Sequence, residues 1–229
     1  MTHAWSTLLP AVRTGRPVYH EVFGLPFWED LDAHPDVAAS FDALMGPDGH
    51  GTPDPEVLVS RDWESVRTIV DVGGGTGTLL VEILQARPQT LGTLVDFPRT
   101  VAQSEQVFRI AGVEKRVTTV GRSFFDPLPA GADLYLLSRV LNDWPDPDAT
   151  AILRRCAEAV GPTGRVVVIG GVSADGNTGH GLSPELVLLG GVTRFLERFR
   201  ELAGEAGLEV QAAGILASGR FAVECRRLA

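Results

Sequence analysis

Beyond residue 66, short apolar runs alternate with longer segments in which apolar residues recur every three or four positions. The apolar runs predict strands at 67–72, 92–96, 117–120, 133–137 and 165–169. The longer segments predict helices near 76–86, 98–111 and 147–160. GPTG, a glycine stop with a proline, follows the last of these helices. Alternating strands and helices predict an α/β fold, a doubly wound sheet with helices on both faces.

The last part of the chain has a different pattern. VTRFLERFRELAGEAG, at 192–207, has the apolar spacing of an amphipathic helix. LEVQAAGILASGRFAVECRR, at 208–227, contains two alternating runs separated by a turn signal. The sheet is therefore expected to be mostly parallel, Rossmann-like, and to end in a C-terminal antiparallel hairpin.

The front of the chain predicts short helices. Residues 1–60 place aromatic residues in short segments that proline and glycine separate. DVAASFDALM, at 36–45, carries apolar residues on one helical face, and Pro35 stands where that helix can begin. We therefore expect a short helical linker or lid at 1–62, followed by an α/β domain at 63–229.

Composition and charge narrow the class of partner. The formal net charge is −9, with lysine and arginine scattered, which argues against nucleic acid and favours a small molecule. No apolar run reaches the roughly 18 residues that a membrane span needs, and the first residues lack the order of a secretory signal, so we expect no membrane contact and a cytoplasmic location. Cys156 and Cys225 form no CxxC pair and are expected to be buried free thiols.

The stretch TIVDVGGGTGTLL, at 68–80, is the first candidate site. Asp71 lies near the end of the predicted strand, at the usual place for a ligand in an open parallel sheet. The glycines that follow allow positive φ and a close approach of backbone to ligand; they are Gly73, Gly74, Gly75 and Gly77. The next helix points its amides at negative charge on that ligand.

A second signal stands at the end of the next strand. Asp96 follows Gly77 by about 20 residues, the spacing of an acid that binds ribose hydroxyls. The spacing G-x-G-x-G places Thr78 where a dinucleotide enzyme needs its third glycine, which disfavours an NAD-dependent oxidoreductase. Together with the terminal hairpin, this favours S-adenosylmethionine as cofactor. The alternative is a merely tight turn without a ligand.

Four stretches give the chain a resemblance to a known family: DVGGGTGTLL, LVDFP, SFFDPLPAGADLYLLSRVLNDWPD and the tail LLGGVTRF to FRELAGEAGLEV. The chain resembles the S-adenosylmethionine-dependent small-molecule O-methyltransferases of plant and bacterial secondary metabolism. TGRPVYHEVFGLPFWEDL is similar to the linker ahead of their catalytic domain. The resemblance implies a class I methyltransferase domain at 63–229 and an aromatic natural product as substrate.

Site residues follow from the resemblance position by position. It implies that Asp71 and Gly73 to Gly77 cradle the methionine part of the cofactor and that Asp96 holds the ribose, next to Phe97. It places Ser123 and Phe124 at the adenine, with Ser138 and Trp144 completing the cofactor wall. A large aromatic face at Trp144 suits an adenine ring, although an ordinary core tryptophan is the alternative. Many relatives have aspartate at Ser123.

The chemistry departs from the family pattern at two positions. Asn142 replaces the family's basic histidine in LNDW, and Thr193 replaces a glutamate before Arg194. Because methyl transfer is an in-line displacement, positioning can supply most of the catalysis. Three interpretations remain: a phenol held by Asn142 and Asp143, an amine or acidic acceptor that needs no histidine, or cofactor binding without methylation. Asp143 has a structural alternative as a helix cap.

Further candidates are less specific. Arg194 is a possible substrate contact or a solvated helix charge, and His180 lies in a loop from which it either reaches the strand ends or faces solvent. Relatives carry a further helical domain that drives dimerisation, whereas this sequence starts almost at the linker. The sequence is therefore either a trimmed form or naturally short, and a homodimer stays open. In a trimmed form the front aromatics would be partly exposed or pair with another chain; they are Trp5, Phe23, Phe27 and Trp28.

Overall fold

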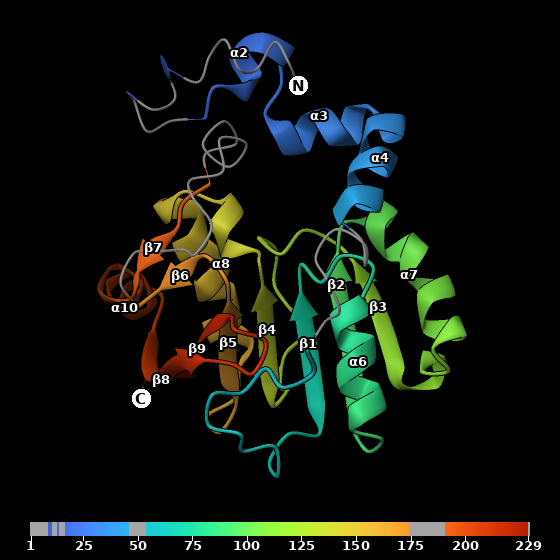
Figure 1. Ribbon diagram of the computed structural model, residues 1–229, viewed down its shortest axis with the longest axis vertical. Helices are drawn as coiled ribbons and strands as arrows, with labels where there is room; N and C mark the ends of the chain where they lie inside the picture. The colour runs from blue at the N-terminus through green and yellow to red at the C-terminus, as the bar shows by residue number, and fades with distance from the viewer. Residues whose placement is uncertain (1–8, 11–12, 14–16, 46–53, 175–190, 229) are drawn as a thin grey trace.

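The computed structural model describes residues 9–10, 13, 17–45, 54–174 and 191–228. In this part of the chain, a seven-stranded sheet has the order β3-β2-β1-β4-β5-β9-β8, and a second sheet pairs β6 with β7 (Figure 1). The strands are β1 Thr68–Val72, β2 Leu91–Asp96, β3 Val117–Gly121, β4 Leu134–Ser138, β5 Arg165–Ile169, β6 Val172–Ser173, β7 Arg194–Phe195, β8 Leu208–Ile215 and β9 Phe221–Arg227.

Helices cover both faces of the large sheet, as the sequence predicts. One core cluster joins α6 and α7 to the sheet, and the other joins α8 and α10 to its opposite face. The helices are α2 Tyr19–Phe23, α3 Phe27–Ala33, α4 Pro35–Met45, α6 Thr78–Ala86, α7 Pro98–Ile110, α8 Asp146–Ala159 and α10 Leu196–Glu205, with short 3-10 turns η2 Glu114–Arg116 and η3 Leu141–Asp143. The predicted α/β, doubly wound fold is confirmed.

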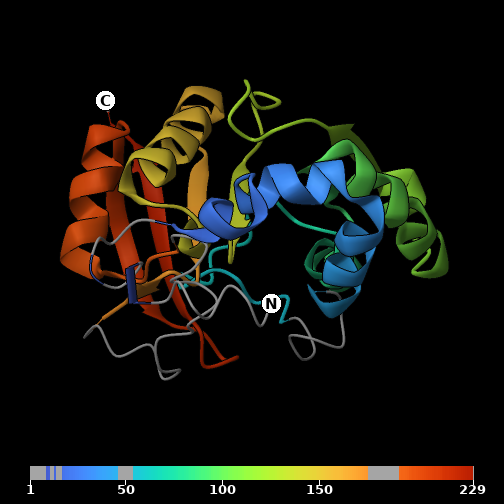
Figure 2. The same ribbon diagram turned by 90° about the horizontal axis from the view of Figure 1, so that it is seen from above.

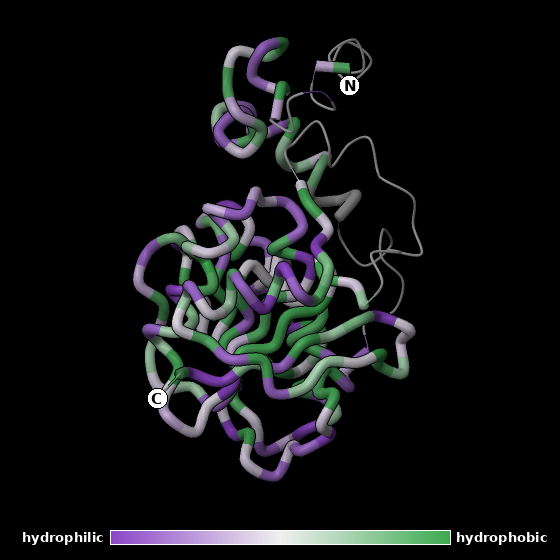
Figure 3. The backbone as a smooth tube through the Cα atoms, turned by 90° about the vertical axis from the view of Figure 1, so that its left-hand side faces the viewer, coloured by the Kyte–Doolittle hydropathy of each residue, from purple (hydrophilic) through white to green (hydrophobic). Residues whose placement is uncertain are grey.

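The central strands form because nearly every side chain in them can be buried. β5 is buried at all five positions, and Leu134 to Leu137 of β4 are buried on both faces of the sheet. Continuous apolar runs of this kind are typical of parallel strands that helices cover on both sides. Figure 3 shows this hydrophobic centre, with polar residues gathered toward the outside.

The C-terminal hairpin adds the two antiparallel strands that the sequence predicts. β9 pairs antiparallel with β5, so that Cys225 lies opposite Val166, and β8 pairs antiparallel with β9. Cys156 and Cys225 are both buried and free, as expected. The hairpin forms the edge of the sheet against which α10 packs.

The tail helix is shorter than its pattern predicts. Arg194 and Phe195 form β7, which pairs in parallel with β6, and α10 begins only at Leu196. The prediction that places Arg194 on the tail helix is therefore wrong. The physical reason is tertiary: the backbone N–H of Arg194 donates to Gly171 O at 2.9 Å, so residues 194–195 pair with β6 before the helix starts.

The front helices stand over the carboxyl ends of the parallel strands. In Figure 1 the arrowhead of β1 points toward α3 and α4, and from above these helices lie across the end of the sheet (Figure 2). The ring of Trp28 on α3 stacks toward Trp144, with centroids 6.0 Å apart, and Asp32 forms an ion pair with Arg99 at the start of α7. Helix α3 is thus in contact with the α/β domain, and the division at residue 62 stays a prediction.

At the other end of the sheet, Arg165 links the segment before β1 to β5 and β9. Its side chain is 5% exposed and forms ion pairs with Asp62 and with Glu224, the latter at 3.7 Å. It also donates hydrogen bonds to the hydroxyl oxygens of Ser60 and Ser65, at 3.1 and 3.0 Å. No helix of the described ranges has the length and the apolar character that a membrane span requires.

We expect Arg165→Met to destabilise the fold by about 3 kcal/mol, because it leaves the buried carboxylate of Glu224 without its cation. The measurement is the free energy of unfolding by urea. The exposed Arg154→Met variant is the control and should change that free energy by no more than about 0.5 kcal/mol. Equal effects of the two variants would contradict the assignment.

Candidate functional site

The glycine turn joins β1 to α6 at the carboxyl end of the sheet. Gly73, Gly75 and Gly77 have φ of +68°, +62° and +82°. A Cβ at Gly77 would lie 2.5 Å from the ring of Phe108, whereas a Cβ at Gly75 would meet nothing within 4 Å. The turn is therefore pressed against the protein at Gly77 and open at Gly75, which is the side available to a ligand.

Asp96 ties this turn to the end of β2. Its Oδ2 accepts a hydrogen bond from the N–H of Gly75 at 2.8 Å, and its Oδ1 accepts one from the N–H of Phe97 at 2.7 Å. The carboxylate is 8% exposed. Two backbone donors thus fix a carboxylate beside the open glycine, and a carboxylate has further lone pairs that can accept hydrogen bonds from hydroxyl groups.

Asp71 lies beneath the turn. It is 1% exposed, and a Cβ added at Gly74 would stand 2.4 Å from its Oδ2. Neither carboxylate oxygen has a hydrogen-bond partner among the described residues. Burial, and secondarily the negative charge of Asp96, raise the pKa of Asp71 to about 7. Asp71 therefore supports the turn from below, and direct contact with a ligand stays a prediction.

Aromatic rings gather next to the turn. Phe97 lies 6.1 Å from Phe124, and Phe124 lies 5.9 Å from Trp144 in an edge-on arrangement, as ring centroids. Trp28 adds a ring from α3, 6.5 Å from Phe97. The rings that the resemblance assigns to the cofactor wall thus come together, and Trp28 joins them because α3 packs here.

The two predicted serines sit at strand ends of the same edge. Ser123 follows β3, and its hydroxyl oxygen accepts the N–H of Phe125 at 3.2 Å, which shapes the turn that presents Phe124. Ser138 is the last residue of β4 and is partly buried. Both lie where the sequence places them, and their contacts with a ligand stay predictions.

Asn142 and Asp143 form a hydrogen-bonded pair on η3. The amide Nδ2 of Asn142 donates to Asp143 Oδ1 at 2.8 Å, and the buried amide oxygen of Asn142 has no partner among the described residues. Burial raises the pKa of Asp143 to about 7, against the opposing effects of the Arg139 charge and the Asn142 hydrogen bond. Asp143 does not cap α8, which begins at Asp146 after Pro145, so its alternative role as a helix cap is wrong.

Arg139, which the sequence analysis did not single out, stands between β4 and this pair. Its backbone has φ of +60° and donates to Ile169 O at 2.7 Å. Burial lowers the pKa of its guanidinium to about 10, and Asp143 offsets part of that effect. Positive φ at an arginine leaves no signal in the sequence, so this residue is found only from the structure.

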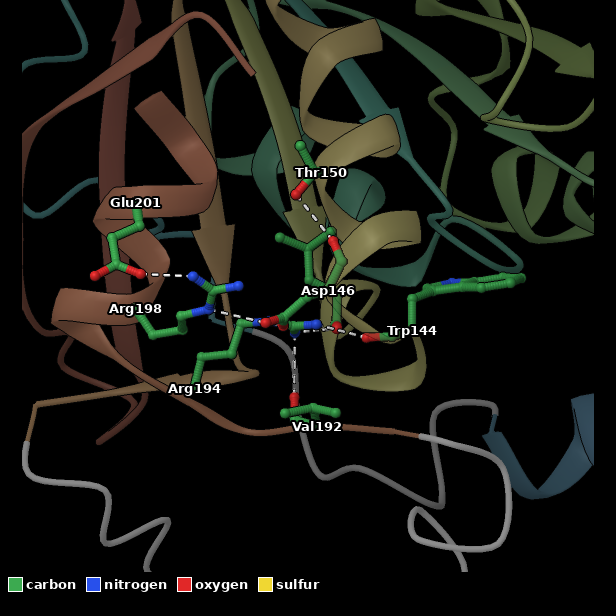
Figure 4. A network of polar contacts seen from close by, with 8 residues as sticks. Trp144, Asp146, Thr150, Val192, Arg194, Arg198 and Glu201 are labelled. Carbon is green, nitrogen blue, oxygen red and sulfur yellow. Dashed lines mark hydrogen bonds and ion pairs between the residues drawn. The ribbon is translucent and has the colours of Figure 1, made fainter. Parts of the chain in front are cut away.

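Arg194 is 2% exposed, and its guanidinium donates hydrogen bonds to acceptors of the protein itself (Figure 4). Nε donates to Asp146 Oδ1 at 2.7 Å, and Nη2 donates to Trp144 O at 2.6 Å. Nη1 donates to Leu141 O and Val192 O, at 2.8 and 3.2 Å. This geometry indicates a structural role for Arg194 in place of the predicted substrate contact or solvated charge.

His180 and the front aromatics are the remaining residues that the sequence raised, beside the question of a metal site. His180 lies outside the described residues. Across the described ranges, no group of three or more His, Cys, Asp or Glu side chains is arranged to hold a metal ion. Trp5 also lies outside the described residues, whereas Phe23 on α2 is 39% exposed.

Comparisons with known proteins show which proteins this chain is similar to. The profile of a family described as O-methyltransferase domain matches residues 5–209. The chain is 44% identical over 208 residues to the 2,7-dihydroxy-5-methyl-1-naphthoate 7-O-methyltransferase of Streptomyces carzinostaticus, covering 90% of this chain and 62% of that protein. It is 40% identical over 214 residues to the aclacinomycin 10-hydroxylase RdmB of Streptomyces purpurascens, covering 90% and 56%. The chain thus spans about three fifths of the length of these relatives.

A solved structure extends the comparison. The O-methyltransferase NcsB1 from neocarzinostatin biosynthesis, crystallised with S-adenosylmethionine and 2-hydroxy-5-methyl naphthoic acid, matches with a TM-score of 0.87 and 40% identity. The match covers 99% of this chain and 69% of that chain. The predicted class I methyltransferase fold is confirmed by this similarity.

The environment of Asp71 predicts a pH-dependent stability. Its folded-state pKa of about 7 lies above the ordinary value, so its contribution is fully present at acid pH and is lost as the pH rises through 7. Between about pH 5 and pH 8, wild-type protein should therefore lose about 2 to 3 kcal/mol of unfolding free energy relative to Asp71→Asn. Urea unfolding at both pH values measures the difference, with the exposed Asp126→Asn as control. A constant difference between wild type and Asp71→Asn would refute the assignment.

Proposed function

Because the chain belongs to the O-methyltransferase domain family, we propose that it transfers the methyl group of S-adenosylmethionine to a hydroxyl of an aromatic natural product. The observation that carries the proposal is the open Gly75 turn beside the carboxylate of Asp96, which two backbone N–H groups hold in place. The names of the relatives support an aromatic acceptor, since one is a naphthoate O-methyltransferase and another was crystallised with a naphthoic acid.

The residues present fit S-adenosylmethionine. Gly75 offers a backbone without a Cβ to the methionine part, and Asp96 accepts hydrogen bonds from the ribose hydroxyls. Phe97, Phe124 and Trp144 provide ring faces and edges for the adenine. When bound, S-adenosylmethionine supplies an electrophilic methyl group on a sulfonium sulfur, with S-adenosylhomocysteine as the product.

Asn142 and Asp143 are assigned to the acceptor. The amide N–H of Asn142 donates to Asp143, and its amide oxygen, which has no partner among the described residues, is left to accept a hydrogen bond from the acceptor hydroxyl. As the acceptor oxygen forms its bond to the methyl carbon, the carbon–sulfur bond breaks and the hydroxyl proton must leave. Asp143, with a pKa of about 7, is the side chain at this point that can take that proton near neutral pH. Positioning supplies the rest of the rate.

A second function comes from a different class. RdmB, a relative at 40% identity, is named a hydroxylase, so an S-adenosylmethionine-binding protein that does not methylate is the alternative. An N-methyltransferase is the alternative within the same class. Incubation with methyl-labelled S-adenosylmethionine and panels of phenols and aromatic amines separates the three, because only the methyltransferases transfer label, and to different atoms.

We also propose that the protein acts in the cytoplasm and can associate as a homodimer. The proposal of a dimer is supported by exposed apolar residues on the front segment, Phe23 at 39% and Leu25 at 36% exposure. Sedimentation analysis distinguishes monomer from dimer. A monomer at all concentrations tested would refute it.

The role of Asp96 predicts the effect of its removal on cofactor affinity. Asp96→Ala should weaken binding of S-adenosylhomocysteine by about 10- to 100-fold, the worth of hydrogen bonds to a charged acceptor. Isothermal titration measures the affinity, and the exposed Asp126→Ala, near the same edge of the sheet, is the matched control. Unchanged affinity in a folded Asp96→Ala protein would show that the ligand binds elsewhere.

The pKa of Asp143 predicts the pH profile of methyl transfer. Below about 7 the carboxyl is protonated and cannot take the acceptor's proton, and above about 7 it is ionised, so kcat should rise with pH through this range. Asp143→Asn should lower kcat and remove this rise, whereas Asp148→Asn on the first turn of α8 should keep it. A rise that persists in Asp143→Asn would assign the titration to another group.

A further inference from the structure

We propose that Arg194 is a positioning residue that holds Asn142 and Trp144 in one rigid frame, and so sets the distance between the acceptor and the cofactor. The inference rests on the proposed function, since it concerns the same site. Arg194 touches neither substrate nor cofactor in this role. It acts through the main chain of the segment that carries the site residues.

The guanidinium bridges the two ends of that segment. Nη1 donates to Leu141 O at 2.8 Å and Nη2 donates to Trp144 O at 2.6 Å. These carbonyls flank Asn142 and Asp143 on either side in the chain. Because the guanidinium is planar and its donors have fixed directions, the two carbonyls are held at a fixed separation, with the two acceptor-facing residues between them.

A third contact fixes the frame to the fold. Nε of Arg194 donates to Asp146 Oδ1 at 2.7 Å, and Asp146 is the first residue of α8 (Figure 4). Arg198 donates from Nε to the other carboxylate oxygen at 2.9 Å. Hydrogen bonds from both arginines lower the pKa of Asp146, although its partial burial opposes them, so the carboxylate stays ionised at neutral pH. The frame is thus anchored on the first residue of α8.

The backbone around Arg194 holds Asn142 from the other side. The N–H of Val192 donates to Asn142 O at 2.9 Å, and the N–H of Arg194 donates to Gly171 O at 2.9 Å. A Cβ at Gly171 would lie 2.9 Å from the backbone nitrogen of Asn142, so the segment before β6 is in direct contact with the segment that carries Asn142. Asn142 is therefore fixed through its own main chain as well as through its neighbours.

Arg198 provides a natural comparison. It also binds Asp146, but its side chain is 45% exposed and its other partner is Glu201, at 2.5 Å on the same helix. Among the described residues, the side-chain hydrogen bonds of Arg198 go to Asp146 and Glu201 and to none of the carbonyls of residues 141–144. Loss of Arg198 removes its ion pairs with Asp146 and Glu201, whereas loss of Arg194 removes an ion pair with Asp146 and also the hydrogen bonds to the carbonyls of Leu141 and Trp144.

The test compares Arg194→Lys and Arg194→Met with the matched control Arg198→Met. Arg194→Lys keeps the charge but lacks the planar fork, so one ammonium cannot hold both carbonyls and Asp146 in place. We expect both Arg194 variants to lower kcat by about 10- to 100-fold, the cost of a misplacement of about 1 Å. Arg198→Met should leave kcat within about twofold of wild type.

Three readouts separate positioning from a loss of folding. The first is kcat normalised to the folded fraction, with the KM for S-adenosylmethionine measured beside it, since a destabilised but correctly arranged protein loses folded fraction and not kcat per folded molecule. The second is near-ultraviolet circular dichroism, which reports whether the fold is retained. The third is the change in Trp144 fluorescence on binding S-adenosylhomocysteine, isolated by subtracting the signal of Trp144→Phe. This change should be altered in Arg194→Lys and unaltered in Arg198→Met.

The fluorescence readout also separates this proposal from the proposed function. If wild-type protein binds S-adenosylhomocysteine but methylates no acceptor, the methyltransferase proposal fails while the Trp144 signal still tests the frame. If Arg194→Met does not fold, the test uses Arg194→Lys and Asp146→Asn, the second of which removes the negative charge that Arg194 and Arg198 share on α8. Wild-type kcat and an unaltered Trp144 signal in folded Arg194→Lys would overturn the proposal.

Discussion

The parallel pairing of β1 with β2 on one side and β4 on the other is the constraint on which this molecule depends. The register sets Asp71 opposite both Leu94 and Leu136, so all three strands end at the same edge. The candidate site residues lie at that edge: the glycine turn follows β1, Asp96 ends β2, Ser138 ends β4 and η3 follows β4. Parallel strands bring together turns that are far apart in the chain, and they leave backbone donors and carboxylates facing one side.

Two buried arginines tie connecting segments to the large sheet, one at each end of its strands. Arg165 ties the chain ahead of β1 to β5 and β9, on the side away from the site. Arg194 ties the chain ahead of α10 to the segment after β4, on the side of the site. Arg165 pairs with the carboxylates of Asp62 and Glu224, and Arg194 donates to the carbonyl oxygens of Leu141 and Trp144.

The sequence predicted most of the fold because its signals were local. The runs that became β1 and β5, and the glycine turn with Asp96 behind it, depend on neighbours a few positions away or on a fixed spacing. Arg194 was misplaced because a local pattern cannot show that residues 194–195 pair with β6. Trp28 was named only as a front aromatic, and Arg139 was not named, since the packing of α3 and a positive φ on an arginine arise from tertiary contacts. The assignment of Asn142 and Asp143 rested on resemblance, and their hydrogen bond to each other is known only from the structure.

The buried carboxyl of Asp71 makes the glycine turn sensitive to the charge of a ligand bound there. It lies under Gly74, without a hydrogen-bond partner among the described residues, and it titrates near neutrality. A cation resting on the turn favours the ionised form of Asp71, and a neutral ligand of the same shape does not. In the proposed function the donor is a sulfonium, a cation, and the spent product is a neutral thioether, so an ionised Asp71 would favour the donor. By that difference, the same carboxyl that weakens the fold at alkaline pH would favour retention of the donor and departure of the spent product.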